Sequence, residues 1–236
     1  MSPFPKAVLF DLGNTILKIN EVNMLRAFSR VFELGKNPKG VSFIKCGFVG
    51  KEIGDMLDKE ANASQHEFPI RAFVELFSYR TGITFDMPYA ELEMEIWKSM
   101  HTFSPEPGVR EVLAELTAKG IPMGVVSNAA FSTEALQWEM AKHDLLKPFQ
   151  FVISSADCIY RKPHPEIFKA AAARLGFDPK DIWFVGDVFD WDITGSYGVG
   201  MKPIWYNPKK NTAPKTEKVA PNAWREIRNW NEFLTA

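Results

Sequence analysis

Residues 7–15 read AVLFDLGNT, and this stretch decides which fold the sequence predicts. The apolar run 7–10 is typical of a short buried strand, and Asp11 follows it directly. Gly13 and Asn14 favour turns, so they mark the end of that strand. A strand that ends in a carboxylate predicts a polar side chain at one edge of a buried sheet.

The second half of the chain repeats this arrangement. We predict helices over 107–119, 133–143, 165–175, 193–197 and 222–234, and strands over 121–126, 151–153, 182–186 and 204–206. Alternating strands and helices are typical of a parallel sheet with helices on both faces. We therefore expect an α/β, Rossmann-like core, with 207–221 as an exposed loop. Ser127-Asn128 and Asp187 follow strands, so they should lie near Asp11 at the carboxyl edge.

Residues between the first two predicted strands have a different character. They are rich in helix formers, with aromatic residues such as Phe73 and Phe77 at helical spacing. Phe68-Pro69, Thr81-Gly82 and Met87-Pro88 are typical joints between helices. We expect two domains, with residues 18–102 forming a smaller helical domain inserted into a core built from 1–17 and 103–236. The hinges should fall near 16–20 and 98–105.

Composition limits the classes of partner. The chain has 236 residues and a formal net charge of -1, which gives no overall field for a nucleic acid or an anionic membrane. Cys46 and Cys158 are far apart and lack metal-ligand spacing, so we expect two reduced thiols. No apolar run is long enough for a membrane span, and the start is not typical of a signal peptide. We expect a cytoplasmic monomer or homodimer.

Four segments, in this order, carry a family resemblance: AVLFDLGNT, GVVSNA, RKPHPEIF and WFVGDVFDWDITGS. Together they resemble the four motifs of the haloacid dehalogenase superfamily. The resemblance covers residues 1–15 and about 105–206, and it implies a phosphatase-like hydrolase whose insert closes over the site as a cap. Each motif alone is weak, and the ordered set on an alternating frame is what favours the family.

The resemblance assigns roles to particular residues. Asp11 is the nucleophile, and Lys162 holds the phosphate and orients Asp11. Ser127 and Asn128 bind phosphoryl oxygens. Because a phosphate anion repels a carboxylate nucleophile, a hard divalent cation is needed, and carboxylate oxygens suit Mg²⁺. The expected Mg²⁺ ligands are Asp11, Asp187 and the main chain of Gly13; the supporting residues are Asp192, which could pair with Lys162 or the 187 loop, and Asp190.

Each of these residues also has an ordinary structural interpretation. Asp11 could cap a helix, Ser127-Asn128 could form a turn, and Lys162 could be a solvated lysine. Asp190 is more often just solvated, and His164 could contact substrate or be a local structural residue. Only the set of motifs favours function over these alternatives.

Gly13 departs from the family pattern. Most phosphatases of the superfamily have there a second Asp, which protonates the leaving alcohol and later activates water. Its loss corresponds to roughly 10²–10⁴ in rate. Three explanations stay open: substrates with good leaving groups such as acyl or aryl phosphates, replacement of the acid by Asp190 or His164, or binding of phosphate compounds without rapid turnover.

We therefore predict a magnesium-dependent phosphohydrolase that cleaves phosphate monoesters of small metabolites through an aspartyl-phosphate. The alternatives are a 2-haloacid dehalogenase and a slow or non-catalytic phosphate-binding protein. Dehalogenases usually lack an acidic residue at the position of Asp187, so its presence favours the phosphohydrolase. Insert residues that could face the site are Lys45, Phe48, Lys51 and Glu52, although a solvated charged face is the more ordinary interpretation.

Overall fold

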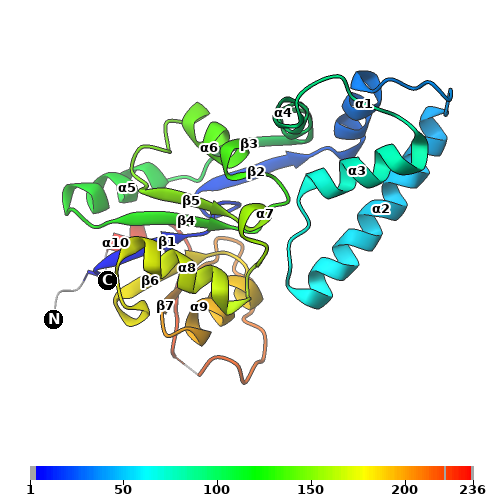
Figure 1. Cartoon of the computed structure of the whole chain (residues 1–236). Coiled ribbons are helices and arrows are strands. Elements are labelled where there is room, and N and C mark those ends of the chain that lie inside the picture. Colours follow the sequence, from blue (N-terminus) through cyan, green and yellow to red (C-terminus); the bar gives the residue numbers. More distant parts are fainter. Residues whose placement is uncertain (1–3, 221, 235–236) are drawn as a thin grey trace.

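A six-stranded parallel sheet lies at the centre of the computed structural model, which describes residues 4–220 and 222–234 (Figure 1). In spatial order the strands are β5 (Phe151–Ser154), β4 (Met123–Ser127), β1 (Ala7–Phe10), β6 (Ile182–Gly186), β7 (Lys202–Tyr206) and β8 (Arg225–Ile227). Every neighbouring pair is parallel. The predicted α/β core is confirmed, and the strand over 7–10 lies between β4 and β6.

β1 is buried on both faces, as a strand inside a parallel sheet must be. Val8 and Phe10 belong to the core shared with α5 (Val109–Ala118), α6 (Thr133–Lys142) and α10 (Asn231–Leu234). Ala7 and Leu9 belong to the core under α8 (Pro165–Leu175). Figure 1 shows α5 and α6 on one side of the sheet, with α8 and α9 (Thr194–Gly198) on the other.

The longer helices of the core begin and end close to their predicted bounds. α8 starts at Pro165, whose missing N–H costs nothing in the first turn, and it ends before Gly176, which adopts a φ of 75°. The sequence did not predict the shorter turns α7 (Ser155–Cys158), η1 (Pro179–Asp181) and η2 (Phe189–Ile193), the last a π-helical turn.

Between β1 and β4 the chain leaves the sheet through β2 (Leu17–Val22) and returns through β3 (His101–Pro105). These strands pair antiparallel and enclose α1 (Met24–Leu34), α2 (Phe43–Ser64), α3 (Ile70–Thr81) and α4 (Tyr89–Met100). The helices and their joints at Pro69, Gly82 and Pro88 agree with the prediction.

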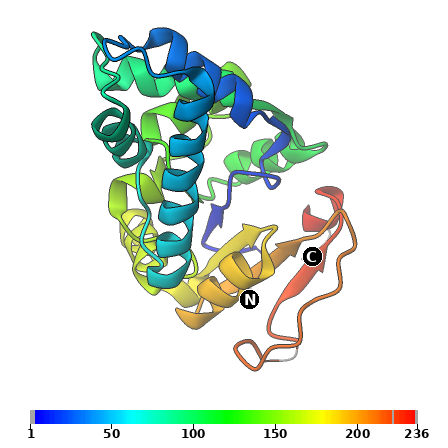
Figure 2. The same cartoon turned by 90° about the vertical axis from the view of Figure 1, so that its right-hand side faces the viewer.

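The sequence predicts a hinge near 16–20 and a helical insert from residue 18, whereas residues 17–22 form the strand β2. The reason is that β2 pairs with β3, some eighty residues later in the chain. The local sequence pattern does not indicate so distant a pairing partner. Figure 2 looks toward the edge where the core strands end, and α2 crosses the view there.

The predicted helix over 222–234 is wrong. Residues 225–227 form β8 instead, and within the described part of the predicted range only 231–234 are an α-helix. β8 pairs with the otherwise open edge of β7, and this pairing satisfies main-chain groups that an isolated helix would not reach. Residues 1–3, 221, 235 and 236 of the predicted core and loop lie outside the described residues.

Two further expectations concern thiols and membrane spans. Cys46 is buried and Cys158 half-buried, and both are free thiols. Among the described residues, no helix combines the length and the apolar character that crossing a bilayer requires.

Phe10→Ala should test the central packing of the sheet. Phe10 is fully buried against Phe149, Trp230 and Phe233. Removing its ring should lower the free energy of unfolding by about 3–5 kcal/mol, measured by urea denaturation. Phe48→Ala is the matched control, because Phe48 is 68% exposed and should change stability by less than about 0.5 kcal/mol. Equal losses in the two variants would contradict this description of the core.

Candidate active site

The candidate site lies where three adjacent strands end. Asp11 follows β1, Ser127 ends β4 and Asp187 follows β6. Since these strands are parallel neighbours, their carboxyl ends meet at one edge. The main chain of Asp11 continues the ladder, donating from its N–H to the carbonyl oxygen of Val185 at 2.8 Å.

Lys162 places a buried ammonium group among these carboxylates. Its side chain is 1% exposed, and Nζ donates to Asp11 Oδ1 and to Asp192 Oδ1, each at 2.6 Å. Burial alone would lower the pKa of Lys162, but the charges and hydrogen bonds of Asp11 and Asp192 outweigh it and raise that pKa. Lys162 therefore stays protonated inside the molecule.

Asp192 is fixed from two sides. Its second oxygen, Oδ2, accepts a hydrogen bond from the N–H of Val188 at 2.9 Å, which closes the π-helical turn after Asp187. A β-carbon on Gly186 would lie 2.3 Å from the Asp192 carboxyl carbon, so only glycine lets the two segments approach this closely. The expected pairing of Asp192 with Lys162 and with the 187 loop is thus present in the geometry.

Three carboxylates, from Asp11, Asp187 and Asp192, each offer an oxygen within 4.8 Å of the others. Burial, and then the charges of Asp11 and Asp192, raise the pKa of Asp187 to about 8. Burial also raises the pKa of Asp192 to about 6, although Lys162 opposes this. One ammonium group does not offset the negative charge, so this set of hard oxygen donors fits a divalent cation.

Asn128 makes contacts that the sequence did not suggest. Its Nδ2 donates to the carbonyl oxygen of Lys162 at 2.9 Å, and its Oδ1 accepts from the Lys162 N–H at 2.7 Å. The carboxamide therefore holds the main chain of Lys162, whereas the prediction assigned Asn128 to the substrate. Ser127 is buried beside it at the end of β4.

The face of Gly13 on which a side chain would stand is covered by an apolar group. A β-carbon at this position would lie 3.2 Å from Cδ1 of Ile19, a residue of β2. The first strand of the insert thus places a methyl group next to the position that lacks the family carboxylate.

Asp190 and His164, the two candidates to replace the acid missing at Gly13, are not part of the carboxylate cluster. Asp190 is exposed and is not one of the three clustered carboxylates, as expected of the solvated residue that was the alternative to a supporting role. His164 caps α8 through Nδ1, which accepts from the N–H of Glu166 at 3.3 Å, and its ring stacks on Tyr160. His164 thus has the local structural role that was the alternative to a substrate contact.

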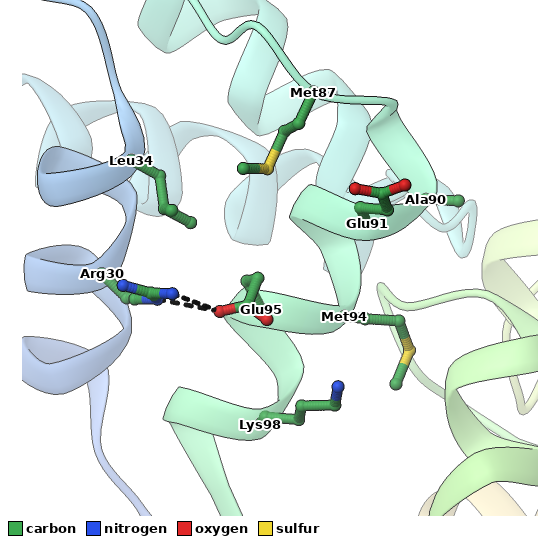
Figure 3. Close-up of a pocket in the computed structure, with 8 residues that line it drawn as sticks. All are labelled: Arg30, Leu34, Met87, Ala90, Glu91, Met94, Glu95 and Lys98. Carbon is green, nitrogen blue, oxygen red and sulfur yellow. Dashed lines mark hydrogen bonds and ion pairs between the residues drawn. The ribbon is translucent and has the colours of Figure 1, made fainter.

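The insert residues suggested for substrate choice are exposed. Lys51 pairs with Asp55 and Glu52 with Arg80, both within the insert, while Phe48 is 68% exposed and Lys45 is also exposed. An open hollow of about 580 Å³ lies between α1 and α4, where Arg30 and Glu95 form an ion pair (Figure 3). None of the residues that line it belongs to the carboxylate cluster.

Sequence reasoning missed a further contact with the insert. The segment 65–67, which joins α2 to α3, lies against 159–161, the residues that lead directly into Lys162. No signal in the sequence pointed to it, because both segments are short loops without periodicity.

Comparison with known proteins identifies the family of the chain. The family model described as haloacid dehalogenase-like hydrolase matches residues 8–206. The chain therefore belongs to the haloacid dehalogenase-like hydrolases, as the four motifs predicted.

Two relatives and one solved structure illustrate the similarity. Ribulose-1,5-bisphosphate 5-phosphatase of Halopiger xanaduensis is 25% identical over 210 residues, which cover 87% of this chain and 86% of the relative. Glyceraldehyde 3-phosphate phosphatase of Pyrococcus abyssi is 35% identical over 101 residues, which cover only 42% of this chain and 41% of the relative. A 2-haloacid dehalogenase from Pseudomonas syringae shares the fold, with a TM-score of 0.64, 23% identity, and coverage of 98% and 97%.

Asp187→Asn should stabilise the protein at pH 8 when EDTA removes divalent cations. Because the pKa of Asp187 is raised from 3.8 to about 8, the folded state binds more protons here than the unfolded state, so stability falls as pH rises between these values. Asparagine has the size of the neutral acid and lacks this penalty. The thermal midpoint of the variant should exceed that of wild type at pH 8, and the difference should shrink toward about pH 5. If wild type were more stable than Asp187→Asn at pH 8 in EDTA, the claim that ionised Asp187 destabilises the folded state would be contradicted.

Proposed function

We propose that the protein is a magnesium-dependent phosphohydrolase that forms an aspartyl-phosphate on Asp11. The observation that carries the proposal is the contact between Lys162 Nζ and Asp11 Oδ1 at 2.6 Å, within a group of three carboxylates of which Asp11 and Asp192 are buried and Asp187 is half-buried. A carboxylate held in this way at a strand end is oriented for attack, and the ammonium group supplies positive charge for a phosphoryl oxygen.

Each residue of the site has a separate role in the proposed reaction. Lys162 holds Oδ1 of Asp11, so Oδ2 is the oxygen that attacks phosphorus in line with the leaving group. Ser127, at the end of the adjacent strand, donates its hydroxyl to a phosphoryl oxygen. Asn128 keeps Lys162 in place through its two main-chain hydrogen bonds. Water then attacks phosphorus and releases Asp11.

Asp11, Asp187 and the carbonyl oxygen of Gly13 are the proposed Mg²⁺ ligands. When bound, the ion would offset the repulsion between the nucleophile and an anionic substrate. The raised pKa of Asp187, which follows from burial and from the charges of Asp11 and Asp192, supports this assignment because a cation would relieve the same repulsion.

The apolar surroundings of Gly13 favour substrates whose leaving group needs no proton. Ile19 covers this face, and neither Asp190 nor His164 belongs to the carboxylate cluster. We therefore propose acyl or aryl phosphates, or slow turnover of alkyl phosphates. The phosphatase names of the relatives, with glyceraldehyde 3-phosphate and ribulose 1,5-bisphosphate as their stated substrates, support a small phosphorylated metabolite. Residues 18–102 are the proposed cap domain, which would exclude water on closure.

A 2-haloacid dehalogenase is the second candidate, favoured by one observation. A halide leaves without protonation, so an apolar group beside Gly13 would cost that reaction nothing. Asp187 is an obstacle for it, because a half-buried carboxylate with no cation to neutralise it adds negative charge where a carboxylate substrate would bind. EDTA separates the two, since it should abolish phosphohydrolysis and leave dehalogenation intact.

Asp11→Asn should abolish phosphate release from p-nitrophenyl phosphate in the presence of Mg²⁺. The loss should be at least about 10³-fold in kcat, since the amide is a poor nucleophile and covalent catalysis is removed. Glu60→Asn, at an exposed position of α2, should retain wild-type activity. Equal rates for wild type and Asp11→Asn across a panel of phosphorylated metabolites would end the proposal.

The leaving group should control the rate of the wild type. Acetyl phosphate and p-nitrophenyl phosphate should turn over about 10²-fold or more faster than an alkyl phosphate, because no acid assists the poorer leaving group. Gly13→Asp should be combined with Ile19→Ala, which makes room for the new side chain. This double variant should raise kcat on the alkyl phosphate and reduce the difference in rate between good and poor leaving groups. Equal wild-type rates on all three substrates would show that another group supplies the proton.

A further inference from the structure

The segment that leads into Lys162 is held by the insert. His66 and Tyr160 form an antiparallel bridge between two otherwise irregular segments. On either side of this bridge, the Glu67 N–H donates to the carbonyl oxygen of Ile159 at 2.5 Å, and the Arg161 N–H donates to that of Gln65 at 3.0 Å. The main chain is therefore paired with the insert up to the residue before Lys162.

The held segment contains a strained turn. Ile159 has a φ of 69° and a ψ of -44°, and the N–H of Tyr160 donates to the carbonyl oxygen of Cys158 at 2.8 Å. This is a γ-turn with positive φ, which is rare and costly for a β-branched residue. Ile159 is also 60% exposed, so packing of its own side chain does little to hold the turn. Such a conformation persists only where the surroundings fix it, and here a main-chain bond from Glu67 does so.

The Glu67 side chain connects both loops of the site. It is 8% exposed, and Oε2 accepts from Ser155 Oγ at 2.8 Å and lies 3.7 Å from Arg161 Nε. Ser155 Oγ in turn accepts from the N–H of Ala129 at 2.9 Å. Ala129 follows Asn128, the residue that holds the main chain of Lys162. A buried carboxylate from the insert thus reaches the two loops that carry Asn128 and Lys162.

We propose that Glu67 is a positioning residue, which fixes the loop of Lys162 through Ser155 and Arg161 and so makes the reactivity of Asp11 depend on docking of the 65–67 segment. This inference rests on the proposed function, because it concerns how the same site is assembled. Glu67 is not one of the three carboxylates, and it acts through Ser155, which holds the N–H of Ala129, and through Arg161, the residue before Lys162.

The geometry explains why a small change would matter. Lys162 Nζ lies at 2.6 Å from two carboxylate oxygens, so its tip has almost no freedom to follow a displaced backbone. A shift of about 1 Å in a group that orients the nucleophile can cost about 10²-fold in rate. Loss of Glu67 should therefore lower kcat and leave KM nearly unchanged, because no substrate contact is removed.

The test compares Glu67→Ala, Glu67→Gln and Ser155→Ala with Glu60→Ala, a matched control at an exposed position of α2. The first readout is hydrogen exchange at the amides of residues 160–162, which needs no activity. Glu67→Ala should accelerate it about tenfold, with strand β6 unchanged as internal reference, because a charged hydrogen-bond partner of the loop is lost. Glu60→Ala should match wild type in exchange and in turnover.

The second readout is kcat with acetyl phosphate and Mg²⁺. Glu67→Ala should lower it about tenfold or more at constant KM, and Glu67→Gln, which still accepts from Ser155, should restore part of the loss. Ser155→Ala should add little to Glu67→Ala, because both variants break the same hydrogen bond.

Three results would overturn the inference: unchanged exchange, faster exchange with wild-type kcat, or a change in KM alone. If wild type and Asp11→Asn are equally inert, the proposed function fails and exchange alone decides whether Glu67 fixes the loop.

Discussion

The burial of one ammonium group between two carboxylates is the constraint on which the rest of the structure depends. Lys162 is almost fully excluded from water, and desolvating it is tolerable only because Asp11 and Asp192 both accept from Nζ. That requirement explains several local features. Gly186 lets Asp192 approach closely, and the π-helical turn fixes the second oxygen of Asp192. Asn128 hydrogen-bonds both the N–H and the carbonyl oxygen of Lys162. The carboxyl edge of the sheet brings these segments together.

The same arrangement leaves negative charge in excess. With Asp187 included, three carboxylates face one ammonium group, and the raised pKa of Asp187 expresses the cost, which comes first from burial and then from the neighbouring charges. A fold selected for stability alone would gain by replacing such a group with an apolar residue. Its presence at the end of β6 suits the cation and the anionic substrate that the proposed function requires, and the insert pairs with the segment before Lys162 at the same edge.

Much of this molecule could be predicted where the signal is local. β1, β6 and α8 follow from apolar runs bounded by Asp, Pro and Gly. Asp11 and Asp187 stood out because each follows an apolar strand, and Lys162 stood out through the resemblance of RKPHPEIF to a family motif. Features that depend on distant partners could not be predicted. The β2–β3 ribbon, β8, the Asn128 contacts and the position of Glu67 all arise from pairing between segments far apart in sequence. The helix predicted over 222–234 was wrong because residues 225–227 pair with the open edge of β7.

The most direct test of the account is the location of the phosphoryl group during turnover. Acid quenching during the reaction with acetyl phosphate and Mg²⁺, followed by peptide mass analysis, would identify the modified residue. The account predicts the added mass of one phosphoryl group on Asp11, within the tryptic peptide 7–18, and its absence from Asp11→Asn. Phosphate release with this peptide unmodified, or a phosphoryl group on another residue, would contradict it.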